Sequence, residues 1–110
     1  MAMTNVGSFS LHNGGGFVVR ISFKYIDDNG QTQRSETGDA ILLGQTQTVN
    51  PTNLGVPDGV TLWLYADVQA GYDNQAVQGF AFQNGNSSVA QYTITGTTLN
   101  NTLGLIGVVS

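Results

Sequence analysis

This sequence of 110 residues has few charged residues and no cysteine. Charged residues make up 9% of the chain and only three are basic, so the net charge is −4. Binding to nucleic acid or to an anionic membrane surface needs clustered Lys and Arg, and the sequence disfavours both partners. The complete absence of cysteine excludes disulfides, thiolate zinc sites and a cysteine nucleophile.

Long hydrophobic runs are also missing. No apolar stretch approaches the roughly 20 residues of a transmembrane helix. Residues 1–4 lack a basic region followed by an apolar stretch, so no secretory signal is visible there. The length suits one folding unit, and we expect residues 1–110 to form a single domain.

Alternation of apolar and polar residues is the dominant pattern. In Phe17–Ile26 every second residue from Phe17 to Tyr25 is apolar, and in Val60–Gln69 the same holds from Val60 to Val68. Such segments, separated by turn signals, are typical of strands with one buried face. The sequence therefore predicts an all-β fold, an antiparallel β-sandwich of about seven to nine strands.

Turn signals set the expected order of the remaining strands. Asp27–Gly30 and Asn84–Ser88 carry Asn-Gly, and we expect a hairpin across each of them. Asn13–Gly16 is expected to form a turn, and the polar segment Gln31–Thr37 an edge strand. The other expected strands are Val6–Leu11, Ile41–Val49 with a break at Gly44, Val77–Gln83, Val89–Thr95 and Leu103–Val109.

Residues for catalysis are scarce. His12 is the only histidine, and its place before three glycines is typical of a turn residue rather than of a catalytic base. Most carboxylates stand in turn signals, where aspartate bonds its own backbone. We therefore expect no enzyme, no cofactor and no metal site; the turn aspartates are Asp27, Asp28, Asp58 and Asp73.

Aromatic residues offer one candidate binding surface. Trp63, Tyr65 and Asp67 share the face of their strand that lies opposite the apolar one. An exposed face with two aromatic rings and a carboxylate suits stacking and hydrogen bonding to a glycan. If a second sheet covers that face, Trp63 is part of the core, as is common for tryptophan.

The segment Tyr92–Leu99 ends in Gly-Thr-Thr-Leu and resembles the end of the C-terminal membrane-binding domain of the cholesterol-dependent cytolysins. Three earlier segments also resemble the family, less specifically, and occur in the same order as in the family: Leu11–Gly15, Asp27–Gly30 and Val60–Val68. That domain is a β-sandwich of about this length, so the resemblance covers nearly the whole chain. It implies that Thr98 and Leu99 correspond to the family's cholesterol-recognition pair.

The sequence also departs from the family. The stretch Ala70–Phe80 corresponds to the family's Trp-rich loop, but it holds neither Cys nor Trp. The pore-forming domains are absent as well. The resemblance thus implies a non-enzymatic recognition module that forms no pore alone and binds membrane sterol or lipid through loop tips. Tyr72 and Asp73, in the corresponding loop, are the further candidate ligand-binding residues beside Thr98 and Leu99.

Three hypotheses remain at this point. The first is the sterol- or lipid-binding module, and the second is a lectin-like module that uses Trp63, Tyr65 and Asp67, or loop residues such as Tyr72 and Asp73. The third is a structural protein whose polar edge strands pair with another copy of the chain.

Overall fold

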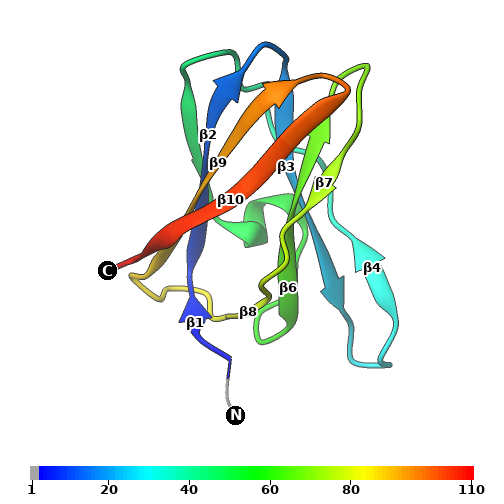
Figure 1. Cartoon of the computed structure of the whole chain (residues 1–110). Helices are drawn as coiled ribbons and strands as arrows, with labels where there is room; N and C mark the ends of the chain where they lie inside the picture. Colours follow the sequence, from blue (N-terminus) through cyan, green and yellow to red (C-terminus); the bar gives the residue numbers. More distant parts are fainter. Residues whose placement is uncertain (1–2) are drawn as a thin grey trace.

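The computed structural model describes residues 3–110, which form two β-sheets packed face to face (Figure 1). The strands are β1 Asn5–Val6, β2 Ser8–Gly15, β3 Val19–Ile26, β4 Thr32–Arg34, β5 Thr46–Val49, β6 Thr61–Val68, β7 Asn74–Gln75, β8 Phe80–Phe82, β9 Val89–Thr97 and β10 Asn100–Val109. A short 3-10 helix, η1, spans Pro51–Leu54 and connects β5 to the segment before β6.

The sheet topology confirms the predicted β-sandwich. The larger sheet has the order β1-β8-β6-β3-β4, with β7 also paired to β6, and the smaller one has the order β10-β9-β2-β5. Most pairs are antiparallel, whereas β1 with β8 and β2 with β9 are parallel. The structure has ten strands in residues 3–110. Two of them, β1 and β7, have only two residues each and were not expected as separate strands from the sequence.

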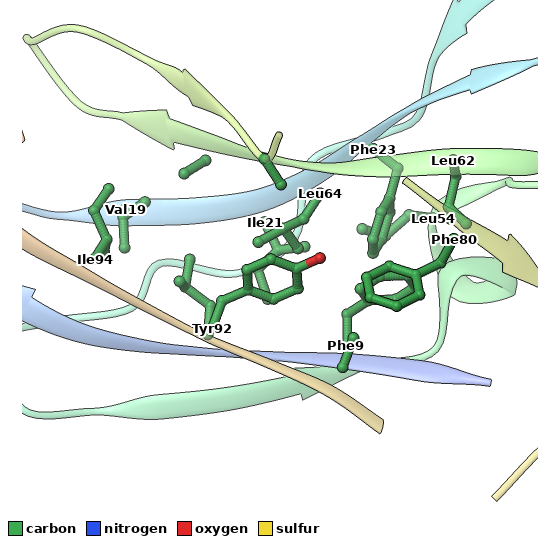
Figure 2. Close-up of a cluster of buried hydrophobic side chains, with 14 of the residues drawn as sticks. Phe9, Val19, Ile21, Phe23, Leu54, Leu62, Leu64, Phe80, Tyr92 and Ile94 are labelled. Carbon is green, nitrogen blue, oxygen red and sulfur yellow. The ribbon is translucent and has the colours of Figure 1, made fainter. Parts of the chain in front are cut away.

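The core lies between the sheets and follows the predicted alternation. The apolar faces of Val19–Ile26 and Thr61–Val68 point inward, as do Ala90, Tyr92 and Ile94 of β9. Phe9 is at the centre of an aromatic group, with its ring centroid 4.9 Å from Phe23, 6.0 Å from Phe80 and 6.3 Å from Tyr92 (Figure 2). Burial raises the pKa of the Tyr92 phenol, whose oxygen has no hydrogen-bond partner within residues 3–110.

The first strand differs from its predicted course. Val6–Leu11 is split at Gly7, where the chain leaves the larger sheet as β1 and enters the smaller one as β2. Gly7 is required there because a Cβ atom would collide with the carbonyl group of Asn86. The turn expected at Asn13–Gly16 begins later, since β2 pairs with β9 as far as Gly15. His12 therefore lies within a strand, and its Nδ1 is 2.8 Å from the Thr46 hydroxyl.

Two further expectations were wrong. The predicted hairpin across Asn84–Ser88 does not form, because β8 belongs to the larger sheet and β9 to the smaller one. The connection crosses between the layers and is held by the amide of Gly7, which donates to Ser88 O over 3.0 Å. The predicted strand Ile41–Val49 contains only β5, since Ile41 forms an isolated bridge with Val19 and a turn follows it.

Other expectations are confirmed. Asp27–Gly30 turns between β3 and β4, and β4 is an edge strand of polar residues. Across residues 3–110, no helix is both long and apolar enough to pass through a membrane.

Candidate functional site

Strand directions bring four connections to one end of the sandwich. The strands β2, β6 and β9 end there, and β3, β5 and β10 begin there (Figure 1). The segments that meet at this end are 14–18, 41–45, 69–73 and 96–99. We refer to these four segments as the tip.

Thr98 and Leu99 form the two-residue turn of the β9–β10 hairpin, closed by the pair Thr97 and Asn100. Two-residue hairpins usually adopt turns with positive φ, whose twist matches that of the strands. Among residues 3–110, Ala70 is the only non-glycine residue with positive φ, so this turn is of neither favoured type. The hairpin tip is instead stabilised by contacts from the segment 69–73.

Those contacts join the two predicted binding segments. The amide of Tyr72 donates to Thr98 O over 2.9 Å, and Asn101 Nδ2 donates to Tyr72 O over 2.9 Å. Asn74 Nδ2 donates to the Asn101 side chain from the other sheet. The backbone of Gly71 lies so close to Thr98 that a Cβ atom would collide with the carbonyl oxygen of Thr98.

Asp73 holds the turn rather than facing outward as a free carboxylate. Its Oδ1 accepts a hydrogen bond of 2.8 Å from the amide of Val68, across the turn that Ala70 makes with a φ of 56°. Left-handed backbone is unfavourable for alanine, and strain of this kind concentrates at functional sites. The structure thus brings Thr98, Leu99, Tyr72 and Asp73 together, with Asp73 positioning the loop that carries Tyr72.

Four large apolar side chains project from the tip. The exposed fractions are 50% for Leu42, 65% for Leu43, 66% for Tyr72 and 65% for Leu99. Asp73 is the only charged residue of the four tip segments. The sequence analysis missed Leu42 and Leu43 because they continue the apolar run of Ile41 and were placed in a strand. Gly44, where a break in the strand was expected, is the local signal that this run ends in a turn.

The side chain of Asn13 ties the loop that carries the two leucines to the rest of the tip. Asn13 is fully buried, and its Nδ2 donates to Phe17 O over 2.6 Å and to Ile41 O over 2.9 Å. Its Oδ1 accepts from the amide of Gly15 over 2.9 Å. Phe17 O is thereby paired and Ile41 O, which also accepts from the amide of Val19, gains a second donor. One side chain thus connects the tip segments 14–18 and 41–45.

The alternative glycan face has a different geometry. Trp63, Tyr65 and Asp67 lie on the outer face of β6 and are half-buried, so Trp63 is not part of the core between the sheets. The Arg34 guanidinium lies 3.9 Å from the centroid of the Tyr65 ring and 3.2 Å from Asp67 Oδ1. Asp67 Oδ2 also accepts from the buried Ser22 hydroxyl over 2.6 Å. Tyr65 and Asp67 are therefore engaged by neighbouring side chains.

Within residues 3–110, no three His, Asp or Glu side chains gather where they could hold a metal ion. The tip segments carry exposed apolar side chains, hydroxyl groups and one carboxylate, that of Asp73.

Comparison with solved structures places this geometry among known folds. The chain superposes on listeriolysin O with a TM-score of 0.50 and 17% identity, over 90% of this chain and 22% of that one. The fold resemblance to the cytolysins is confirmed. The human-specific toxin intermedilysin has a TM-score of 0.48 and 16% identity, over 94% of this chain and 23% of its own. No family model and no curated protein matches the sequence.

The cytolysin-like chain corresponds to only a small part of these toxins, since it spans 22% of listeriolysin O. The resemblance concerns the fold of that part. The remaining length of each toxin has no counterpart in this chain.

Proposed function

We propose that this chain is a non-enzymatic recognition module that binds a neutral, sterol-containing membrane surface through its tip. The observation that carries the proposal is the group of exposed apolar side chains on three of the four tip segments, which together hold a single charged residue. Exposed apolar groups on a rigid end are expected at a site for lipid or for a partner protein. The cytolysin fold favours lipid.

Burial energies support a contact made by several side chains together. Burying one leucine contributes about 1.5–3 kcal/mol, so a single leucine gives only weak binding. Leu42, Leu43 and Leu99 are exposed by 50%, 65% and 65%, so burying what remains of the three contributes about twice that amount. Tyrosine is favoured at membrane interfaces, where its ring is buried and its hydroxyl is hydrated. The Thr98 hydroxyl, next to Leu99, can hydrogen-bond a sterol hydroxyl.

The charge of the chain supports a neutral rather than an anionic target. With three basic residues and a net charge of −4, the chain gains nothing from anionic headgroups. We therefore expect phosphatidylcholine and cholesterol to be sufficient, with no requirement for phosphatidylserine.

The glycan alternative has less support. A sugar that stacked on Tyr65 would have to displace the Arg34 guanidinium, which also pairs with Asp67. Trp63 is the only tryptophan in the chain, so its fluorescence reports directly on binding at that face. A sugar that shifts the Trp63 emission would favour this alternative.

The double variant Thr98→Gly with Leu99→Gly is expected to lose binding to cholesterol-containing phosphatidylcholine vesicles by at least about tenfold, because it removes one leucine and one hydroxyl from the contact. The measurement is vesicle co-sedimentation, with circular dichroism to verify the fold. Ile26→Ser is the matched control, since Ile26 is an exposed apolar residue at the opposite end of β3. Undiminished binding of the double variant would refute the role of Thr98 and Leu99.

A further inference from the structure

The four sheet edges differ sharply in length and in chemistry. β1 has two residues, β4 has three including Arg34, and β5 has four polar or β-branched residues. Short or charged edges of this kind prevent pairing with other chains. β10 has ten residues and no charge, and its second half exposes Leu105 by 37%, Ile106 by 63%, Val108 by 39% and Val109 by 46%.

An apolar pocket lies beside this edge. It has a volume of about 260 Å³ and is lined by Leu103 and Leu105 of β10, Tyr92 of β9 and residues 76–78 before β8. Val77, on its rim, is 99% exposed. On the inner face of β10, Leu105 and Val108 are therefore only partly covered by the rest of residues 3–110.

An exposed strand edge with a pocket beside it is a typical binding site for an additional β-strand. Backbone hydrogen bonds supply affinity in such complexes, and pockets for alternate side chains supply specificity. A strand added to β10 would direct every second side chain toward the pocket, because side chains alternate between the two faces. The occupant must therefore be an extended segment with apolar residues on one face and no charge.

We propose that this occupant is β10 of a second copy of the chain, paired antiparallel about a twofold axis. β10 itself has the required chemistry, since Leu105 and Val108 share the inner face and no residue from 100 to 110 is charged. Two copies, each with a net charge of −4, thus meet where neither carries charge. An isologous interface of this kind closes after two copies and does not propagate into a fibre.

The register follows from the faces of the strand. A bulge between Leu105 and Gly107 shifts the alternation, so that Leu105 is paired with Tyr92, and Val108 with Ala90, both of which are inward residues of β9. The inner-face residues of the two β10 strands lie on the same side of the joined sheet when Leu105 is opposite the second copy's Val108. The twofold axis then passes between Ile106 and Gly107, and the two bulges lie next to each other at the centre.

Sedimentation velocity of the lipid-free protein tests the proposal without depending on membrane binding. The unmodified chain is expected to be a dimer at about 100 μM, and Val108→Lys to be a monomer, because each lysine would carry a charge into the apolar interface opposite the second copy's Leu105. Thr48→Lys, on the exposed edge strand β5, is the matched control and should remain a dimer. An unmodified chain that stays monomeric at this concentration, or a Val108→Lys variant that still dimerises, would overturn the proposal.

The cysteine-free sequence allows the register to be tested separately. Mixing Leu105→Cys and Val108→Cys chains under oxidation is expected to give a disulfide-linked dimer, since opposed residues have Cβ atoms only about 4.5–5.5 Å apart. Leu105→Cys alone should remain largely unlinked. Equal cross-linking of the single variant and the mixture, or none in either, would contradict the proposed register.

Discussion

Replacing Leu99 with aspartate is expected to lower the affinity for cholesterol-containing phosphatidylcholine vesicles by at least about a hundredfold, since this side chain must then carry a charge into the apolar contact. Leu99 is well suited to such a test because 65% of its surface is exposed and it supports no part of the core. The turn that it occupies is held by backbone contacts from Tyr72 to Thr98, which the substitution leaves in place. The effect should therefore appear in binding and not in folding.

Two comparisons distinguish insertion of Leu99 from a general effect of charge. Leu99→Met, which keeps an apolar side chain of similar size, should bind within about threefold of the unmodified chain. Ile26→Asp, at the far end of β3, adds the same charge away from the tip and should have little effect. Vesicle titrations measure the affinity of each variant. An equal loss of affinity for Leu99→Asp and Ile26→Asp would contradict insertion at the tip.

Replacing Asn13 with aspartate is expected to lower the free energy of unfolding by about 3 kcal/mol or more, because it leaves the buried Phe17 O without its donor and places a carboxylate against it. The substitution preserves the shape of the side chain but removes the Nδ2 group that donates to Phe17 O and Ile41 O. An ionised carboxylate would also face those two oxygens in a fully buried position. Asn13→Leu is expected to be similarly destabilising, since it removes all three hydrogen bonds.

Chemical denaturation measures this effect, with Asn53→Asp as the control at an exposed asparagine of η1. If Asn13 also holds the loop of Leu42 and Leu43 in place, vesicle binding by Asn13→Asp should weaken even where the protein is folded. A change below about 1 kcal/mol would mean that the three hydrogen bonds contribute little to stability.

The sequence predicted well those features that depend on neighbouring residues. Alternation in Phe17–Ile26 and Val60–Gln69 identified two central strands and their buried faces, because one face of each packs against the core. The Asp27–Gly30 turn and the polar edge strand after it were predicted for similar reasons. The fold class followed from these elements.

Features that depend on contacts between residues far apart in the sequence were predicted wrongly or not at all from local patterns. The residues around Asn84–Ser88 carry a hairpin signal, yet the strands on either side join different sheets, which is decided by packing with Gly7 and β6. The tip depends on contacts between Tyr72 and Thr98, far apart in sequence. The family resemblance, rather than any local pattern, selected Thr98 and Leu99, and it did not indicate Leu42 and Leu43.

Binding of the unmodified chain to phosphatidylcholine vesicles, with and without cholesterol, tests the central claim most directly. Co-sedimentation of the protein with vesicles that contain about 50 mol% cholesterol, and little or none with cholesterol-free vesicles, is the predicted result. The exposed leucines would then be binding residues, and Leu99→Asp should abolish the difference. Equal recovery in the supernatant with both kinds of vesicle would contradict sterol recognition by the tip.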